Sequence, residues 1–579
     1  MSEKEDIAFS KPVTKNVPFL SHVYFCKGCN VPVILSVDKE GALLVPQKCT
    51  LCGGEVSYLA ADLRPVFPEE KVLISLLLRM PPEENVKKSV WACNSTYFIE
   101  DKKYSVSTKM LREADASAIS KELEAQKNLS LRESPAYRIF ERQIDTFVSA
   151  NKKRLDFIKQ DGQEFVQKQA ERFSEERIVL SFSGGKDSTA SADIVTKALS
   201  DASLTHLFGD TTLEFPQTYE YVERYKKNHP FAEFKTARNS DQNFMEVCED
   251  IGPPARMMRW CCSMFKTGPI TRVLNRKYGN MQILTFYGIR AAESAARSKY
   301  DQVSENTESV KIQKQTVASP IFYWKDIDVW LYLLGEKVDF NDAYRLGYDR
   351  VGCWCCPNNN TRAQFLSKIY MKNQSEKWRT FLVDFARSIG KPDAEEYVDS
   401  GKWKARQGGN GVKASGDVKL KFTACTSEEH AKIYSLTHKF DDSFLNMLIP
   451  FGKISKELGR RLINETLVLE PKSKIPIIAV QPFNQDGFEY AVKIKTMNVK
   501  DHEDLQRKIG YQVKKFNACR KCLKCESVCR QGAISIVGGE YYINPGKCVC
   551  CKMCVTEKYL TGGCMMDKYL RTKSGKNEI

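Results

Sequence analysis

The sequence predicts a multidomain α/β protein whose core is a doubly wound parallel sheet. An apolar strand over 178–182 leads through a glycine-rich turn into a helix over about 189–199, and further strands are expected at 204–208 and 283–287. Strands that alternate with helices in this way are typical of parallel sheets. Tight groups of cysteines near both ends of the chain indicate smaller modules attached to this core.

Length and composition agree with this prediction. The chain has 579 residues, of which 42% are hydrophobic and 28% charged, and this excludes wholesale disorder. At roughly 150 residues per domain, the length corresponds to about four domains. The first residues are polar, and the longest aliphatic run near the front, 72–78, is too short to cross a membrane. We therefore expect a cytoplasmic protein with no membrane partner, whose 21 cysteines serve metal or redox sites instead of disulfides.

The chain divides into six expected segments. Apolar residues at helical spacing from Ile144 to Ile158 predict an amphipathic helix that leads into the core. The Gly- and Lys-rich stretch 401–417 predicts a linker or mobile loop. The segments are a polar tail with a first cysteine array (1–60), a small mixed α/β module (61–130), a helical connector (131–176), the α/β core domain (177–415), a small α/β domain (416–512) and a cysteine-rich domain (513–579).

The turn after the first core strand has the composition of a phosphate-binding loop. Backbone N–H groups at the start of a helix attract anions, and we expect Gly184 and Gly185 to take positive φ and let the backbone approach a phosphate. Lys186 adds a positive charge, Ser188 a hydroxyl donor and Asp187 a carboxylate for magnesium. An ordinary glycine-rich turn is the alternative. The candidate nucleotide ligands are Ser183, Gly184, Gly185, Lys186, Asp187 and Ser188.

Ser-Gly-Gly-Lys-Asp-Ser at 183–188 resembles the PP-loop of the ATP pyrophosphatase (adenine nucleotide alpha hydrolase) superfamily. Three more segments resemble motifs of the phosphoadenosine phosphosulfate (PAPS) reductase family within it. They are Asp-Thr-Thr-Leu-Glu-Phe-Pro at 210–216, Gly-Ile-Arg at 288–290 followed by Ser294 and Arg297, and Trp-Lys-Asp-Ile-Asp-Val-Trp at 324–330. The likeness covers about 177–380. It implies a site for ATP, or for the sulfonucleotides PAPS or adenylyl sulfate (APS), with magnesium.

Charged residues beyond the loop extend this site. Asp210 and Arg290 each follow the carboxyl end of an expected strand, which is the edge where open α/β sheets bind ligands. Arg290, Glu293 and Arg297 are spaced to share one helix face, where two guanidinium groups could clamp phosphate or sulfate. A solvated ion-pair face is the alternative. We expect Lys186, Asp187 and Arg290 to act in catalysis, and Asp210, Arg290 and Arg297 to bind nucleotide.

The first cysteine array has the spacing of a structural metal site. Cys26-x-x-Cys29 and Cys49-x-x-Cys52 are separated by 19 residues. Two such pairs can close a tetrahedral site of four thiolates, most often around zinc. The array therefore predicts a zinc ribbon over the first 60 residues, with a rubredoxin-like iron site as the alternative.

A second set of cysteines lies inside the core domain. Cys261-Cys262 and Cys353-x-x-Cys356 resemble the cysteines that hold a [4Fe-4S] cluster in assimilatory APS reductases. The resemblance implies one cluster at this domain, and a zinc site or a redox-active dithiol is the alternative. Cys355 lies inside the second pair, so the choice of ligands among 353, 355 and 356 stays open.

The surroundings of this set suggest reactivity. Arg256, Arg259 and Lys266 flank the first pair, and nearby cations are expected to lower thiol pKa values and attract anions. If a catalytic sulfur carrier exists, Cys355 is the first candidate because it lies beside the expected cluster.

The last group of cysteines resembles a two-cluster bacterial ferredoxin. Two runs spaced as Cys-x-x-Cys-x-x-Cys are each followed by a further cysteine, although the second gap is nine residues and Arg530 replaces the usual proline. In that family the last cysteine of each run serves the other cluster. The resemblance implies one [4Fe-4S] on Cys519, Cys522, Cys525 and Cys564, and another on Cys529, Cys548, Cys551 and Cys554. A zinc-binding cysteine cluster is the alternative.

Together these features favour an enzyme that couples an adenine nucleotide to electron flow. In one reading, ATP is cleaved between its α and β phosphates to adenylate a substrate, and sulfur transfer or reduction follows with electrons from the clusters. In the alternative, a cysteine attacks PAPS or APS and sulfite is released. The resemblance to the reductases implies this reaction. In those enzymes the attacking cysteine lies in a C-terminal Glu-Cys-Gly-x-His segment, which is absent from this sequence. The intact loop therefore favours ATP.

A third reading is a non-catalytic nucleic-acid-binding or redox-sensing protein. Basic residues at 402–406, and a faint resemblance of 61–130 to the PUA fold of RNA-binding proteins, favour tRNA or DNA as a partner. The formal net charge is +16. Thiolates bound to metal would lower it to roughly +8, which weakens that argument. The expected partners are thus an adenine nucleotide, a sulfur-containing substrate or donor, and an external electron donor.

Overall fold

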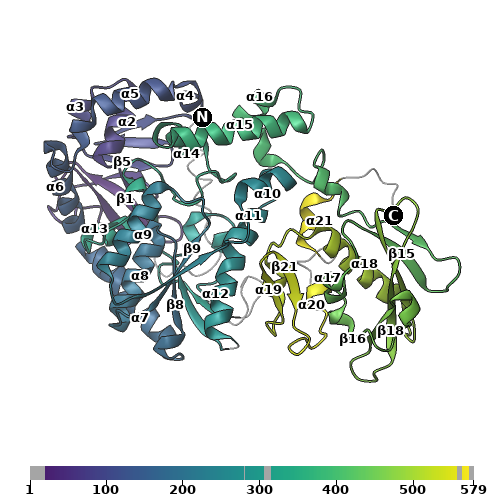
Figure 1. Ribbon diagram of the computed structural model, residues 1–579. Coiled ribbons are helices and arrows are strands. Elements are labelled where there is room, and N and C mark those ends of the chain that lie inside the picture. The colour runs from purple at the N-terminus through teal and green to yellow at the C-terminus, as the bar shows by residue number, and fades with distance from the viewer. Residues whose placement is uncertain (1–19, 280, 306–314, 557–563, 573–579) are drawn as a thin grey trace.

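The computed structural model describes residues 20–279, 281–305, 315–556 and 564–572 (Figure 1). Its core is a mixed α/β domain around a six-stranded, mostly parallel sheet with strand order β10-β9-β8-β11-β13-β12. All neighbours in this sheet pair in parallel except β12 and β13. The strands are β8 (Ile178–Phe182), β9 (Thr205–Asp210), β10 (Glu233–Arg238), β11 (Ile283–Tyr287), β12 (Val303–Glu305) and β13 (Gln315–Ala318).

Helices cover both faces of this sheet, as predicted for a doubly wound core. Leu180 of β8 packs with the helices α7 (Lys152–Ala170), α8 (Lys186–Leu199) and α13 (Asp326–Gly335). Its neighbour Val179 points the other way and packs against α12 (Gly268–Tyr278). Because successive side chains of a strand face opposite sides, this alternation requires cover on each side. The first and third predicted strands have the expected bounds, and the second begins one residue later and is longer.

Two small modules precede the core. The first is an antiparallel sheet with order β2-β1-β3, built from β1 (Leu20–Cys26), β2 (Val31–Val37) and β3 (Ser57–Ala60). The second carries a four-stranded antiparallel sheet and four helices. Its elements are β4 (Arg64–Pro65), α2 (Pro68–Leu78), α3 (Pro82–Asn85), β5 (Val90–Cys93), β6 (Thr96–Ile99), β7 (Lys102–Ser105), α4 (Thr108–Glu113) and α5 (Ala116–Ala125).

The helical connector consists of two helices instead of the single one that the apolar stripe suggested. The helix α6 (Pro135–Ala150) ends at Asn151, where α7 begins. The Asn151 side chain accepts a hydrogen bond from the Ile34 N–H (2.7 Å) and donates to the Pro32 carbonyl (3.0 Å). The break therefore attaches the first small sheet to the core.

The stretch 401–417 is not the loose linker that its composition predicted. Trp403 is 4% exposed and packs edge-to-face on Trp378, with 6.0 Å between ring centroids. Lys404 donates to the Asn359 carbonyl (2.7 Å), and Arg406 donates to the carbonyls of Ile251 and Pro253 (3.0 Å each). These buried anchors make the stretch 401–417 a strap across the core domain, which its Gly and Lys content does not reveal.

The remaining helices of the core domain lie between β9 and the strap. They are α9 (Pro216–Asn228), α10 (Phe244–Ile251), α11 (Trp260–Cys262), α14 (Thr361–Tyr370), α15 (Lys372–Ser388) and α16 (Ala394–Asp399).

The rest of the chain forms a second lobe (Figure 1). A six-stranded sheet with order β14-β15-β19-β18-β17-β16 packs against the helix α18 (His502–Ala518), which leads into the cysteine-rich segment. The elements are β14 (Phe422–Ala424), β15 (Ala431–Leu436), α17 (Asp442–Asn446), β16 (Lys453–Ser455), β17 (Thr466–Leu469), β18 (Pro476–Phe483), β19 (Tyr490–Thr496), α19 (Lys524–Val528), β20 (Ile534–Val537), β21 (Glu540–Ile543), α20 (Met553–Thr556) and α21 (Met565–Leu570).

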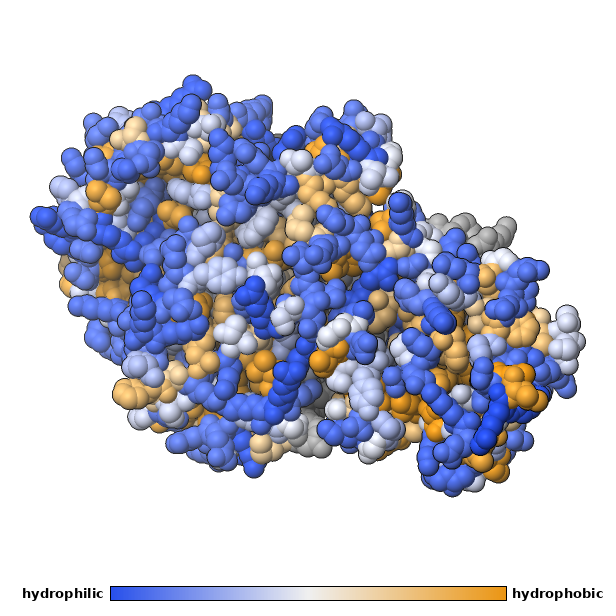
Figure 2. Space-filling model, in the orientation of Figure 1, coloured by the Kyte–Doolittle hydropathy of each residue, from blue (hydrophilic) through white to orange (hydrophobic). Residues whose placement is uncertain are grey.

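The surface is mainly hydrophilic on the face shown in Figure 2, with apolar groups scattered between polar ones. Within the described ranges, no helix combines the length and the apolar character that crossing a bilayer requires.

Replacing the strap's tryptophan tests whether the strap is a structural element. Trp403→Ala is expected to cost about 3–5 kcal/mol of local stability, because it removes a buried aromatic side chain. Limited proteolysis should then cut within 401–417 about tenfold faster or more. Lys402→Ala, at an exposed neighbouring position, should leave the cleavage rate unchanged. Equal cleavage of the Trp403 variant and the unaltered protein would show that the stretch is the mobile loop first expected.

Candidate functional site

The Ser183–Ser188 turn is held in shape by its own last residue. The Ser188 hydroxyl accepts a hydrogen bond from the Ser183 N–H (3.1 Å) and donates to the Gly185 carbonyl (2.9 Å). Gly184 has φ +70°, but Gly185 has φ −92°. The expected positive φ is thus correct only for Gly184. A side chain there would also meet the Thr218 methyl group at 2.9 Å, so both conformation and space require glycine.

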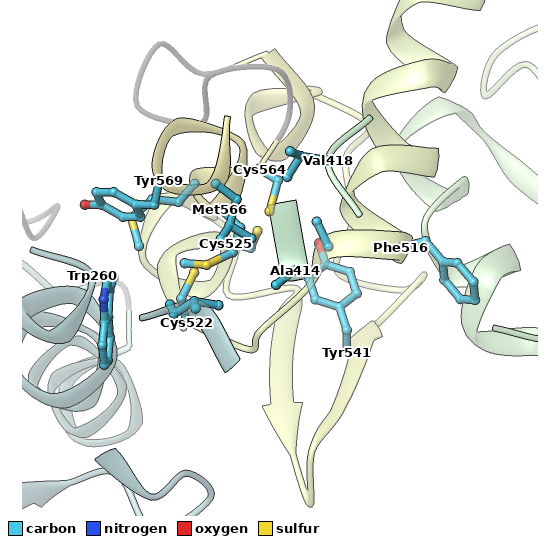
Figure 3. Packing of buried hydrophobic residues seen from close by; sticks show 14 of the residues in the cluster. Trp260, Ala414, Val418, Phe516, Cys522, Cys525, Tyr541, Cys564, Met566 and Tyr569 are labelled. Atoms are coloured by element: carbon cyan, nitrogen blue, oxygen red, sulfur yellow. The ribbon is translucent and has the colours of Figure 1, made fainter. Parts of the chain in front are cut away.

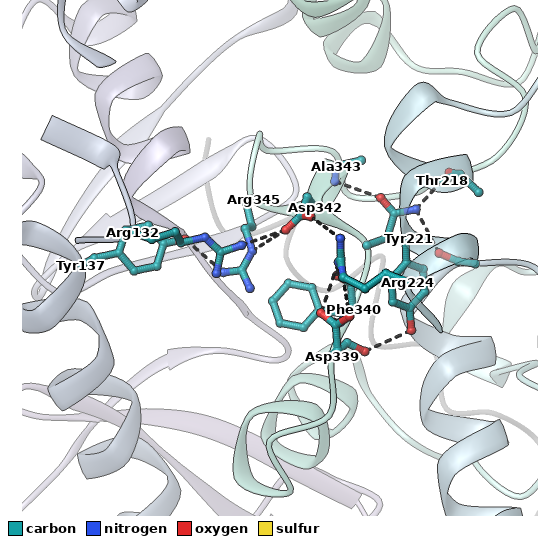
Figure 4. Close-up of polar contacts among 12 residues, drawn as sticks. Arg132, Tyr137, Thr218, Tyr221, Arg224, Asp339, Phe340, Asp342, Ala343 and Arg345 are labelled. Carbon is teal, nitrogen blue, oxygen red and sulfur yellow. Dashed lines mark hydrogen bonds and ion pairs between the residues drawn. The ribbon is translucent and has the colours of Figure 1, made fainter. Parts of the chain in front are cut away.

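The segment 339–345 supports the turn from outside (Figure 4). Asn341 donates to the Gly184 carbonyl (3.0 Å) and the Thr218 hydroxyl (2.9 Å), and the Tyr344 hydroxyl accepts the Lys186 N–H (3.0 Å). The segment is fixed in turn by ion pairs of Arg224 with Asp339 and Asp342. The sequence motifs do not predict these supports, because residues 339–345 follow the last motif, at 324–330.

Four buried charges meet where the turn enters α8. The Lys186 ammonium lies 3.1 Å from Asp187 and 3.0 Å from Asp326, and the Arg290 guanidinium lies 2.6 Å from Asp187 and 2.8 Å from Asp326. Although burial opposes ionisation, Arg290 and Lys186 lower the pKa of Asp187 to about 2. Burial alone would lower the pKa of Lys186, but Asp187 and Asp326 raise it above its usual value. Both partners of the Lys186–Asp187 ion pair are therefore charged at neutral pH.

The end of β11 lies directly against this network. A Cβ atom at Gly288 would stand 2.4 Å from the Asp187 carbonyl oxygen and 2.6 Å from the Ser188 nitrogen. The glycine therefore lets the backbone after β11 approach the turn after β8, which brings Arg290 within reach of Asp187.

Arg290 and Arg297 do not share a helix face, so that prediction is wrong. Two short 3₁₀ turns, Ala291–Glu293 and Arg297–Lys299, are separated by Ser294 in extended conformation. Arg297 forms an ion pair with Glu293, and burial together with the nearby Arg350 lowers the pKa of Arg297. Arg290 organises the loop in this structure, and Arg297 lies at the rim of the site.

Asp210 connects the nucleotide edge to the second cysteine set. Its carboxylate accepts hydrogen bonds from the Thr212 N–H (2.8 Å) and the Tyr219 hydroxyl (2.9 Å), which shapes the turn after β9. That turn touches the Cys353 segment, since the Thr211 hydroxyl lies 3.3 Å from the Cys353 sulfur and the Trp354 N–H donates to the Leu213 carbonyl (2.9 Å). The loop after β8 and the turn after β9, which contacts the Cys353 segment, thus lie at one edge of the sheet.

The pKa values of Cys261, Cys353 and Cys356 in the second set are raised, against expectation. A hydrogen bond with Cys262 and burial raise the pKa of Cys261 well above its usual value, and burial raises that of Cys353. Arg350 and Arg259 oppose the effect of burial at Cys356 without reversing it. The flanking cations therefore do not outweigh desolvation.

Cys355 does not have the surroundings of a sulfur carrier. It is 4% exposed, and burial raises its pKa far above that of a free thiol. A nucleophilic sulfur needs an accessible thiolate. The burial of Cys355 thus argues against our first candidate for a sulfur carrier. Cys353 and Cys355 both lie near enough to Cys261 to raise its pKa, and Cys262 has the same effect on Cys356, so the choice of ligands stays open.

The four N-terminal cysteines form a compact group. Cys26, Cys29, Cys49 and Cys52 place their sulfurs within 4.8 Å of one another, with 3.5 Å between Cys26 and Cys52 and 3.8 Å between Cys29 and Cys49. Zinc–sulfur bonds of about 2.3 Å in a tetrahedron require nearly these separations. The donor set therefore fits one zinc or iron ion. A hydrogen bond from Gly54 and the neighbouring thiols lower the pKa of Cys52 to about 7.

The C-terminal cysteines gather around the end of α18 (Figure 3). Burial and the thiols of Cys564, Cys525 and Cys519 raise the pKa of Cys522 well above its usual value. Cys554 likewise lies among Cys525, Cys529 and Cys548, which together with burial raise its pKa to about 12. Cys564 thus lies near members of the first set that the resemblance implied, whereas Cys554 lies near Cys525 of that set as well as near Cys529 and Cys548. The division into two clusters stays a prediction. Soft thiolate sets of this kind suit iron–sulfur clusters.

Lys515 is a site residue that sequence analysis missed. It is 1% exposed and donates to the Cys554 carbonyl. Burial alone would lower the pKa of Lys515, but thiols of both C-terminal groups raise it. The only sign of this role in the sequence was that a lysine occupies a position on the apolar face of the helix α18.

Comparison with known proteins agrees with the geometry of the core. Residues 177–359 match the family model of the phosphoadenosine phosphosulfate reductase domain. The chain therefore contains a PAPS reductase domain. An uncharacterized protein of Methanocaldococcus jannaschii is 32% identical over 270 residues, which are 46% of this chain and 54% of that protein. The chain thus spans about half the length of this relative.

Two further proteins are similar to about a third of this chain. Adenosine 5'-phosphosulfate reductase of Staphylococcus epidermidis is 26% identical over 198 residues, which are 33% of this chain and 76% of that enzyme. The crystal structure of PAPS reductase from Candida auris is 18% identical, covers 35% of this chain and 95% of that chain, and has a TM-score of 0.27. The four N-terminal cysteines and the C-terminal thiols lie outside the matched domain.

The close approach at Gly288 gives one testable prediction. Gly288→Ala should displace the turn after β8, because its methyl group would overlap the Asp187 carbonyl. We expect faster hydrogen–deuterium exchange across 183–190. Gly416→Ala, where a Cβ would meet no atom within 4 Å, should exchange as the unaltered protein does. Unchanged exchange in the Gly288 variant would contradict the packing described here.

The compact thiol group gives another. Cys29→Ser or Cys49→Ser should reduce the metal content of the purified protein by one zinc or iron ion per chain, since three thiolates hold such an ion poorly. Cys93→Ser, in the neighbouring module, should keep the full content. Elemental analysis of zinc and iron in the three variants measures this loss. Equal metal content in all three variants would show that the four thiols do not bind a metal ion.

Proposed function

We propose that the chain binds ATP at the PP-loop, cleaves it between the α and β phosphates, and uses the adenylated product for a sulfur transfer or reduction supplied with electrons by iron–sulfur clusters. The PAPS reductase domain gives the nucleotide class, and the intact Ser183–Ser188 loop favours a pyrophosphate group over a sulfonucleotide. In this proposal the protein works in the cytoplasm, where thiols stay reduced.

The observation that carries the proposal is the shared edge of the sheet. The loop follows β8, and the turn that touches Cys353 follows the adjacent strand β9. An acceptor bound between them would meet the nucleotide on one side and the thiols on the other. Cys261, Cys262, Cys353 and Cys356 would hold one [4Fe-4S] cluster there, and the C-terminal groups would hold two more.

The C-terminal module is packed directly against this edge. Gly268, at the start of α12, lies so close to Leu523 that a Cβ would stand 2.6 Å from the leucine Cβ. Arg272 of α12 forms an ion pair with Glu526 of α19 (3.1 Å). Tyr569 lies near thiols of both the C-terminal and the core set, since burial together with Cys522, Cys262 and Cys261 raises its pKa to about 12. This contact supports electron transfer from the C-terminal clusters to the site in the core.

The chemistry assigned to the chain's own residues is binding and charge compensation. An oxygen of the acceptor attacks the α phosphorus, the bond to the bridging oxygen breaks, and pyrophosphate leaves with the electron pair. Asp187 would hold magnesium, which would supply charge compensation for the phosphates, and Lys186 and Arg290 would add positive charge that stabilises the leaving group. A sulfide-level sulfur then displaces AMP. If the sulfur donor holds this sulfur in a sulfur–sulfur bond, two electrons from an external donor are needed to cleave that bond and release the sulfur at the sulfide level.

Removing the loop's positive charge tests the proposal. Lys186→Met should lower pyrophosphate release from ATP by about 100-fold in anaerobically purified protein, because a buried cation beside the phosphates is lost. Lys197→Met is the matched control, since Lys197 lies on the same helix but pairs with Asp193 and Glu336. The assay should include tRNA and DNA among the acceptors together with a sulfur donor.

The alternative is reduction of PAPS or APS. Relatives named APS reductase favour it, as does the cysteine set beside the nucleotide edge. Sulfite released from either sulfonucleotide in the presence of a reductant, with no pyrophosphate from ATP under any condition, would establish this alternative and exclude the first.

A further inference from the structure

The helix that carries Asp326 into the nucleotide site is capped by a residue from another module. The first N–H groups of α13, those of Asp326 and Ile327, donate to the Asp62 carboxylate at 2.9 and 3.0 Å. Asp62 lies between β3 and β4, in the connection of the two N-terminal modules. A helix start leaves its first N–H groups without partners inside the helix, so an outside acceptor stabilises it.

Lys325, which precedes α13, also binds the N-terminal modules. Its ammonium donates to the carbonyls of Ser21 and Ala61, the latter at 2.7 Å, so the residues on both sides of α13's start bind the same connection. Ser21 belongs to β1, which ends at the metal-site residue Cys26. Asp328 completes the cap by accepting the Lys325 N–H (2.9 Å), and it forms an ion pair with Arg154 of α7 (2.9 Å). The start of α13 is thus fixed from three sides.

The position of this helix start decides the geometry of the charge network. One oxygen of Asp326 contacts both the Lys186 ammonium and the Arg290 guanidinium, at 3.0 and 2.8 Å. Hydrogen bonds of this length weaken steeply when a partner moves by an ångström. Asp62 also lies near enough to raise the pKa of Arg290, after Asp187 and Asp326, although burial opposes the rise.

We infer that Asp62 is a positioning residue of the nucleotide site, which acts through Asp326 on Lys186 and Arg290. This inference rests on the proposed binding of ATP at the loop. It assigns the N-terminal modules a part in nucleotide binding that the match to residues 177–359 does not cover. Three carboxylates, Asp62, Asp187 and Asp326, then balance the three cations Lys186, Arg290 and Lys325 around the loop.

Three variants separate this role from general stability. Asp62→Ala removes both acceptors, whereas Asp62→Asn keeps one of the two. Asp115→Ala is the matched control, because Asp115 caps α5 in the same module by accepting the N–H groups of Ser117 and Ala118. Loss of a cap is expected to weaken ATP binding about 3- to 30-fold in the Asp62→Ala variant. The Asn variant should recover part of the loss, and the Asp115 variant should bind as the unaltered protein.

Two readouts make the outcome decisive. Isothermal titration with ATP and magnesium measures binding, and hydrogen–deuterium exchange without nucleotide measures the amides of 183–190 and 326–328. Faster exchange in both segments of the Asp62→Ala variant, and not in the Asp115→Ala variant, supports the inference. If neither the unaltered protein nor any variant binds ATP, this exchange result still supports the inference, and only the proposed function fails. If exchange rises at 326–328 but not at 183–190, or if ATP binds equally to all variants, the inference is overturned and Asp62 is a cap without influence on the loop.

Discussion

The arrangement of this protein depends on one buried charge network, Lys186 and Arg290 with Asp187 and Asp326. Its members come from the ends of β8 and β11 and the starts of α8 and α13, so four elements are fixed by a single set of ion pairs. Desolvated charges of this kind contribute little net stability when paired, but a lost partner leaves an uncompensated buried charge that costs about 3–5 kcal/mol. The network therefore enforces one geometry of the loop more than it stabilises the fold.

The same edge of the sheet explains the position of the attached modules. The turn after β9 reaches Cys353, α12 carries the C-terminal module through Arg272 and Gly268, and α13 carries the N-terminal modules through Asp62. Each module is anchored to an element that ends at the nucleotide edge. Ligand binding in open α/β sheets occurs at this edge, so modules placed there can act on a bound ligand directly.

What the sequence could predict is local. The strand 178–182, the turn after it and the four N-terminal cysteines follow from apolar runs and spacing, because their partners lie within a few residues or in a repeated pair. Contacts between residues that are far apart in the sequence could not be predicted. Asp62 and Asp326 are far apart in sequence, and the strap 401–417 looks like a loop until Trp403 is seen to be buried. The helix expected at Arg290 was wrong because the pairing of Arg290 with Asp187 outweighs helical spacing.

The thiols show why the metal centres and the fold depend on each other. Burial raises the pKa of Cys564 to about 12 and also raises that of Cys522, which favours the protonated thiols in the metal-free core. A cluster binds only thiolates, and assembly must therefore release protons. Lys515 lies among these sulfurs, where its ammonium group would give a countercharge to thiolates formed on metal binding. A buried cation is costly in an apolar core, so its place at the end of α18 fits the proposal that these cysteines would carry negative charge as metal ligands.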